Sequence, residues 1–204
     1  KTMIPVIDFN TNSYGELLEK IREAYTTVGF AVFTNSLTQT DQHTMNHWFH
    51  SMKGFFKLDD DTKLKYPYQS ETNLGYSKVG DENVDPTAPK DMKESFNYND
   101  TRMDDALWPT EIPHFRQTAL ETICIADDLT LRILKLFDDI LDCGTTLVDA
   151  HREPFNTTRV IHYPAYTGEI EPRQMRIGEH SDYGTITLLW QINDVPGLQV
   201  QDLD

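Results

Sequence analysis

The residues best suited to chemistry in this sequence are the histidine and the aspartate of the triplet His180-Ser181-Asp182. Two residues that are two positions apart on an extended strand point to the same side, so the imidazole and the carboxylate would lie together. The pair would supply two of the three ligands of a 2-His-1-carboxylate iron site, which leaves coordination positions open for oxygen chemistry. We expect the third ligand, a distal histidine, to lie beyond Asp204, outside this chain.

The pattern of a histidine two residues before an acid occurs twice in the chain. With seven histidines and 33 acidic residues among 204, about one match is expected by chance. The other match, His151-Arg152-Glu153, stands just before Pro154 at the edge of a short predicted helix, where its two side chains would not share a face. His180 instead follows a predicted strand and precedes a Tyr183-Gly184 turn and an apolar-rich run, which favours this second match.

The composition excludes several classes of function. Lys and Arg total 18 against 33 Asp and Glu, for a formal net charge of −15, so binding of nucleic acid through a basic surface is not expected. No apolar run approaches the length of a membrane span, and the start lacks a signal-peptide pattern. Cys124 and Cys143 have no metal spacing, and we expect reduced, buried thiols in a cytoplasmic protein rather than a disulfide.

The first 57 residues predict two strand–helix pairs. Ser13 and Glu16 have the spacing of a capping box, which marks a helix start, and apolar residues with helical spacing follow up to Gly29. We expect strands at 3–9 and 30–33 and helices at 13–29 and 38–57. His43 and His47 in the second helix have i,i+4 spacing, but no acidic third ligand is near, so we expect a solvated or capping role.

Residues 58–110 form a long polar connection that is rich in Asp, Asn, Pro and Gly. A connection of this length in a compact domain is usually functional or partly ordered, and this one could act as a lid. Lys93–Tyr98 interrupts it as a predicted strand. The longest helix follows at 114–141, where an apolar stripe indicates core packing and Gly144 follows the end.

Beyond residue 155 the sequence changes to short predicted strands at 157–163, 174–180, 185–191 and 198–201. Closely spaced short strands after a helical half are typical of an antiparallel jelly roll. The predicted fold class is therefore α+β, with an incomplete double-stranded β-helix (jelly roll) core, an N-terminal helical region and a long helix packed on the core. We expect three parts: an N-terminal region at 1–110, a support helix and connection at 111–154, and the first half of the jelly roll at 155–204.

Six sequence blocks occur in the order found in one enzyme family. They are Met3–Phe9, Gly29-Phe30, Lys93–Phe96, Arg159–Pro164, His180–Leu189 and Pro196–Val200. Together they resemble the iron(II)/2-oxoglutarate-dependent oxygenases of the isopenicillin N synthase-like superfamily. The resemblance spans nearly the whole chain, and its most specific part runs from Arg159 to Val200.

The resemblance implies that His180 and Asp182 bind Fe(II) and that 2-oxoglutarate is the co-substrate. Tyr163 matches a position that often hydrogen-bonds the co-substrate, although Ile161 stands where many plant members carry Asn. The family's second His ligand and the Arg-x-Ser pair that holds 2-oxoglutarate lie after the Pro196–Val200 block, so we expect this chain to be part of a longer protein. An open half-barrel would permit self-association through its sheet edges.

The activity implied by the resemblance is oxidation, most simply hydroxylation, of a small-molecule substrate by O2, with release of succinate and CO2. Phe96 resembles a position near the mouth of the active site. Thr187 and Leu189 share a face of a predicted strand, so they either line the pocket or pack outside it. Arg159 and His162 could meet an anionic group, but a surface ion pair or a capped strand end is the simpler interpretation.

Two alternatives stay open. One is an oxidase of the isopenicillin N synthase kind that uses no 2-oxoglutarate, and a downstream Arg-x-Ser pair would argue against it. The other is a truncated, non-catalytic member that binds a partner or ligand, since two ligands alone hold iron weakly. The sequence does not identify the substrate.

Overall fold

The computed structural model describes residues 3–10, 13–153, 155–193 and 195–201. Pro154 and Asp204, which entered the sequence analysis, lie outside the described residues. The chain divides into two compact units, each built from separate stretches of sequence. The first unit contains residues 1–43, 124–155 and 188–204, and the second contains residues 44–123 and 156–187.

The first unit holds a parallel two-stranded sheet and helix α1. Strand β1 (Val6–Asp8) pairs with β2 (Val32–Thr34), and α1 (Tyr14–Thr27) connects them. The predicted capping box is confirmed, because the Ser13 side chain accepts from the Glu16 amide and the Glu16 side chain accepts from the Ser13 amide. Gly29, with φ +76°, follows the helix end as predicted. The core of this unit is apolar and includes Ile7, Leu17, Ile21, Ala24 and Leu136.

Two long helices were predicted within about one residue of their ends. Helix α2 is Gln39–Phe56 and α4 is Phe115–Leu141. Most of the apolar face predicted for α2 is buried: Met45, Trp48, Met52, Phe55 and Phe56. His43 and His47 are exposed, as expected for solvated side chains. A short helix, α5 (Thr146–Ala150), follows α4.

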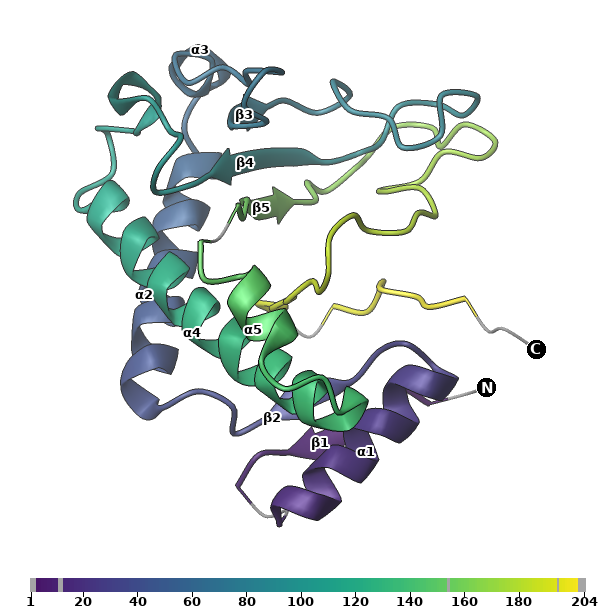
Figure 1. Cartoon of the computed structure of the whole chain (residues 1–204). Coiled ribbons are helices and arrows are strands. Elements are labelled where there is room, and N and C mark those ends of the chain that lie inside the picture. The colour runs from purple at the N-terminus through teal and green to yellow at the C-terminus, as the bar shows by residue number, and fades with distance from the viewer. Residues whose placement is uncertain (1–2, 11–12, 154, 194, 202–204) are drawn as a thin grey trace. The chain divides into compact units, whose positions relative to one another are not determined.

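The second unit is built on an antiparallel sheet of three strands. Strand β4 (Glu94–Tyr98) lies between β3 (Gly75–Ser77) and β5 (Thr158–His162), as Figure 1 shows. The strands predicted at Lys93–Tyr98 and at 157–163 are therefore confirmed. Because side chains alternate along a strand, Phe96 and Tyr98 point to one face, where they pack in an aromatic core with Trp48, Phe55 and Phe115.

The polar connection at 58–110 is more ordered than its composition predicts. Besides β3 and β4 it contains α3 (Asp60–Lys63) and a 3-10 helix, η1 (Asp105–Leu107). Asp59 caps α3, since its side chain accepts from the Thr62 amide. Leu74, Tyr76 and Trp108 are buried in the core of the second unit. This segment is therefore a structural part of the unit over most of its length.

Three predicted strands are corrected by the structure. The described residues at 174–180, 185–191 and 198–201 form no strand. A strand exists only when a neighbour satisfies its backbone amides and carbonyls, and within the described chain β5 pairs with β4 alone. Apolar side chains in these segments are consequently exposed, among them Met175, Leu189 and Leu198. The small sheets and helices give a mixed α/β structure.

Cys124 and Cys143 are free thiols, as predicted, but Cys124 is exposed and Cys143 is partly exposed rather than buried. Helical spacing does not place Cys124 on the apolar stripe of α4, which explains its exposure. Among the described residues, no helix is long and apolar enough to cross a bilayer.

Candidate functional site

The side chains of His180 and Asp182 lie together, in irregular backbone rather than in the predicted strand. The imidazole Nε2 is 3.2 Å from the carboxylate Oδ1, and the two side chains are 38% and 51% exposed. The other ring nitrogen, Nδ1, is 2.9 Å from the Gly178 carbonyl oxygen. A carbonyl can only accept, so Nδ1 must carry the hydrogen, and in the neutral ring the Nε2 lone pair then faces the carboxylate.

This donor set fits a divalent metal ion. Two lone pairs that face each other repel unless a proton or a metal cation lies near both, and iron(II) accepts imidazole nitrogen and carboxylate oxygen. A ring whose second nitrogen donates to a backbone carbonyl is also the usual arrangement of a metal-binding histidine. The described residues contain no group of three or more His, Cys, Asp or Glu side chains that could hold a metal. His180 and Asp182 therefore fit as part of a ligand set.

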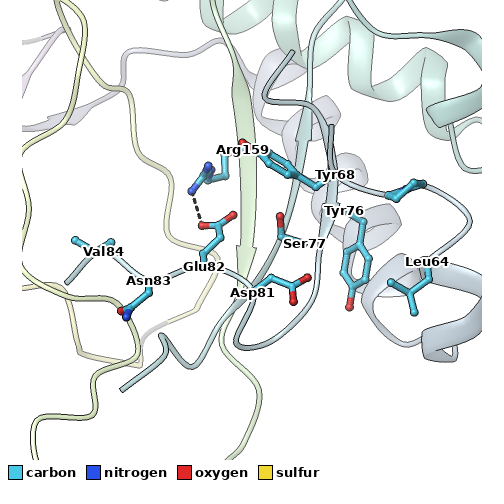
Figure 2. Close-up of a pocket in the computed structure, with 10 residues that line it drawn as sticks. Leu64, Tyr68, Tyr76, Ser77, Asp81, Glu82, Asn83, Val84 and Arg159 are labelled. Carbon is cyan, nitrogen blue, oxygen red and sulfur yellow. Dashed lines mark hydrogen bonds and ion pairs between the residues drawn. The ribbon is translucent and has the colours of Figure 1, made fainter. Parts of the chain in front are cut away.

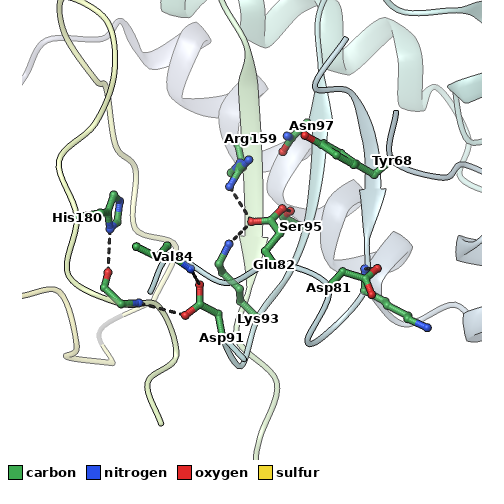
Figure 3. Close-up of polar contacts among 12 residues, drawn as sticks. Tyr68, Asp81, Glu82, Val84, Asp91, Lys93, Ser95, Asn97, Arg159 and His180 are labelled. Atoms are coloured by element: carbon green, nitrogen blue, oxygen red, sulfur yellow. Dashed lines mark hydrogen bonds and ion pairs between the residues drawn. The ribbon is translucent and has the colours of Figure 1, made fainter. Parts of the chain in front are cut away.

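Asp91 supports this site from the segment that precedes β4. Asp91 is buried, with 3% of its surface exposed. The carboxylate Oδ1 accepts from the Gly178 amide at 3.3 Å, and Oδ2 accepts from the Val84 amide at 3.2 Å. The Gly178 carbonyl in turn lies 2.9 Å from His180 Nδ1, and the dashed lines in Figure 3 lead from Asp91 to His180.

A charged cluster covers the face of the sheet opposite the aromatic core. The Glu82 carboxylate binds Lys93 Nζ, accepts from Ser95 Oγ at 3.0 Å and lies 3.1 Å from Arg159 Nη1 (Figure 3). Burial alone would raise the pKa of Glu82, but the hydrogen bond from Lys93 and the charges of Arg159 and Lys93 outweigh it and lower the pKa. Glu82 is therefore held ionised beside two cations.

A pocket of about 590 Å³ opens beside this cluster. Its wall combines the Glu82–Arg159 ion pair with tyrosine rings and small apolar side chains (Figure 2). The lining residues are Leu64, Pro67, Tyr68, Tyr76, Ser77, Asp81, Glu82, Asn83, Val84 and Arg159. A volume of this size suits a small molecule, and the mixture of charged and aromatic groups suits a polar one.

The core face of the same sheet carries a second ionic group at its edge. Glu94 is buried and receives Lys63 Nζ at 2.9 Å, the Tyr76 hydroxyl at 2.5 Å and His162 Nδ1 at 2.7 Å. Burial alone would raise the pKa of Glu94, but the hydrogen bonds from His162, Tyr76 and Lys63 together lower it. This group links α3, β3, β4 and β5 through one carboxylate.

Comparison with known proteins identifies the family. The sequence family described as "non-haem dioxygenase in morphine synthesis N-terminal" matches residues 4–115, which is more than half of the chain. The chain belongs to the 2-oxoglutarate/iron(II) oxygenase family. This confirms the resemblance found in the sequence.

The names of individual similar proteins agree with this family assignment. The 2-oxoglutarate-dependent dioxygenase htyE of Aspergillus rugulosus is 30% identical over 88% of this chain and 59% of that protein. Proline hydroxylase buaE of Petromyces alliaceus is 30% identical over 91% of this chain and 61% of its own length. A full-length Neurospora crassa protein, crystallised in complex with alpha-KG, superposes with a TM-score of 0.74 at 30% identity, covering 89% of this chain and 61% of that one. The chain thus spans about three fifths of the length of these relatives.

The other predicted site residues differ in how far their side chains are exposed. Tyr163 follows β5 and is 40% exposed; burial and then the Asp91 carboxylate raise its pKa. Thr187 and Leu189 are exposed. Phe96 is fully buried among aromatic rings, so its placement does not support the prediction that it contacts substrate. The alternation of β4 explains this, because Phe96 shares a face with Tyr98 rather than with Ser95.

Arg159 and His162 each contact a carboxylate of this chain, Glu82 and Glu94 respectively. This agrees with the ion-pair interpretation rather than with a free anion site. Glu82, Asp91 and the role of Lys93 were not predicted from the sequence. A signal was available, since charged residues that run directly into a buried strand must find partners in the fold.

Proposed function

We propose that this chain is the iron-binding part of a non-haem Fe(II)- and 2-oxoglutarate-dependent oxygenase that oxidises a small molecule with O2. The observation that carries the proposal is the His180–Asp182 pair, whose nitrogen and oxygen donors are 3.2 Å apart in a chain of this family. Hydroxylation is the simplest outcome, with succinate and CO2 as the co-products. Proline hydroxylase buaE and the Neurospora crassa protein, which has also been crystallised with thymine, make free proline and thymine the first substrates to test.

We further propose that β5 is the first strand of an incomplete jelly roll at 155–204, as predicted from the sequence. The three-part division at 1–110, 111–154 and 155–204 is part of this proposal. It is supported by the likeness to the Neurospora crassa protein, which is 30% identical with a TM-score of 0.74.

In the proposed mechanism, His180 and Asp182 would hold Fe(II) through Nε2 and a carboxylate oxygen. The Gly178 carbonyl keeps the proton on Nδ1 and so leaves Nε2 free to bind. The Tyr163 hydroxyl would donate a hydrogen bond to 2-oxoglutarate, and its raised pKa would keep it protonated as a donor. When bound, iron(II) and 2-oxoglutarate would supply the electrons that activate O2, which is the oxidant of the reaction.

The remaining residues of the proposal orient the substrate. The Glu82–Arg159 pair and the tyrosine rings of the pocket would bind a polar small molecule. Thr187 and Leu189 are exposed and are kept as candidate substrate contacts. Phe96 is not kept as a candidate substrate contact, because its side chain is buried in the core.

The test is the release of succinate from 2-oxoglutarate by the protein with Fe(II), O2 and each candidate substrate. His180→Ala and Asp182→Ala should abolish release, whereas His151→Ala, which removes the histidine of the competing motif, should leave it unchanged. Oxygen uptake and substrate oxidation without succinate would instead favour an oxidase of the isopenicillin N synthase kind. Failure of the protein to bind Fe(II) at all would favour a non-catalytic member.

A further inference from the structure

Asp91 is a buried carboxylate that lies one residue away from the proposed metal ligand in the hydrogen-bond network. Its two oxygens divide their contacts between two segments: Oδ2 accepts from the Val84 amide and Oδ1 from the Gly178 amide. Burying a carboxylate is costly unless it accepts hydrogen bonds. The carboxylate therefore holds Val84 and Gly178 at a fixed separation.

Gly178 transmits this restraint to His180. Its amide donates to Asp91 at 3.3 Å, and its carbonyl accepts from His180 Nδ1 at 2.9 Å. The backbone approaches Val84 closely here, because a Cβ built on Gly178 would be 3.4 Å from the Val84 Cβ. A peptide held in this way presents its carbonyl to the imidazole in one orientation (Figure 3).

The rest of the segment is attached independently of Asp91. The Met92 amide donates to the Met175 carbonyl at 3.1 Å. Arg173 Nη2 donates to Asp85 Oδ2 at 2.6 Å and to Thr87 Oγ1 at 3.1 Å. Loss of the Asp91 carboxylate should therefore leave residues 173–175 in place and release only the residues that lead into His180.

We propose that Asp91 is a positioning residue for the metal site. Through Gly178 it fixes the ring orientation of His180 and the tautomer that leaves Nε2 free. The inference rests on the proposed function, since it needs His180 to be a metal ligand. Removing such an outer partner typically costs about 10- to 100-fold in metal affinity.

The test measures Mn²⁺ affinity by calorimetry in the complete protein. Asp91→Asn keeps the shape of the side chain but turns one acceptor into a donor, and it should weaken Mn²⁺ binding by about 10- to 100-fold. Asp85→Asn is the matched control, because it removes a carboxylate of the same segment that binds Arg173 rather than Gly178; its affinity should stay within about twofold of the wild type. His180→Ala should abolish binding.

The outcomes separate the two proposals. If His180→Ala binds Mn²⁺ as the wild type does, the proposed function is wrong and the role of Asp91 is wrong with it. If His180→Ala loses binding but Asp91→Asn behaves like Asp85→Asn, only the positioning role is overturned.

A second measurement needs no metal. In the metal-free wild type, the ¹⁵N shifts of the His180 ring, assigned by their loss in His180→Ala, should show the proton on Nδ1. In Asp91→Asn the two tautomers should mix. A purely structural role would lower the melting temperature without changing the tautomer, and that result would overturn the proposal. Should Asp91→Asn not fold, Asp91→Glu, which keeps both acceptors but moves them by one methylene, must show the same tautomer mixing and weaker Mn²⁺ binding.

Discussion

Glu94 on β4 and His162 on β5 are cross-strand partners, and the carboxylate Oε1 of Glu94 lies 2.7 Å from the imidazole Nδ1 of His162. Lys63 and Tyr76 approach the other oxygen of the same carboxylate, at 2.9 and 2.5 Å. One buried acid thus joins four elements of the second unit. Removing its charge should loosen all of them together.

Glu94→Gln should lower the free energy of unfolding by about 3 kcal/mol, because it leaves the buried Lys63 ammonium with a weaker partner. Urea unfolding followed by circular dichroism measures the change. Glu121→Gln, at an exposed position of α4, should change stability by less than about 0.5 kcal/mol. Equal effects of the two substitutions would mean that the Glu94 group is not a stabilising centre.

Stability should fall in acid because of Glu82 and Glu94. Both have a pKa below the ordinary glutamate value of 4.5 in the folded chain, so the unfolded chain binds protons more readily than the folded one. Their contribution is complete above about pH 4.5 and is lost as the pH falls through the folded pKa values. Urea midpoints measured from pH 7 down to about pH 3 should be flat and then decline. The decline should be shallower in Glu94→Gln, and an unchanged slope would contradict this account.

Gly75→Ala should strongly destabilise the second unit. Gly75 has φ +101°, and an added Cβ would be 2.3 Å from the Pro67 carbonyl oxygen. Backbone must move to accept the methyl group, so a loss of about 3 kcal/mol or more is expected. Gly80→Ala is the matched control, with φ +83° but its nearest contact at 3.8 Å; it should cost about 1 kcal/mol. Thermal unfolding of the two variants should rank them in this order.

Phe96→Ala should lower the free energy of unfolding. The side chain is 0% exposed and contacts the rings of Phe55 and Phe115, so its truncation should cost about 3–5 kcal/mol. Phe155→Ala removes an aromatic ring that is 81% exposed and should cost less than about 0.5 kcal/mol. A stable Phe96→Ala that loses substrate binding alone would restore the prediction that Phe96 contacts substrate.

Local signals in the sequence were sufficient for the three long helices, α1, α2 and α4, but not for the short helix α3. The capping box at Ser13 and the apolar stripes of α2 and α4 act within a few turns, and the helices formed where these patterns predicted. Strand β3 was not predicted, because three residues carry no periodicity and its existence depends on pairing with β4. The absent strands at 174–180 and 185–191 show the converse: a suitable sequence remains irregular where no neighbour completes its hydrogen bonds.

The candidate site likewise contains some contacts that the sequence predicts and others that it does not. The side chains of His180 and Asp182 lie together as predicted, although the backbone there is irregular and not the strand from which the prediction was made. The contacts of Glu82 and Asp91 join residues that are 7 to 87 positions apart. No local pattern encodes such pairings, so they emerge only when the sheet is formed.

The alternation of side chains along β4 also places neighbouring residues under two different evolutionary constraints. Ser95 and Asn97 face the polar cluster, and Glu94, Phe96 and Tyr98 face the core, within five consecutive residues. Substitutions on the first face can alter the polar cluster beside the pocket while the aromatic core of the unit stays intact. A single-residue insertion or deletion in this strand would exchange the two faces, so diversification of this protein should proceed through point changes at alternate positions and not through changes in strand length.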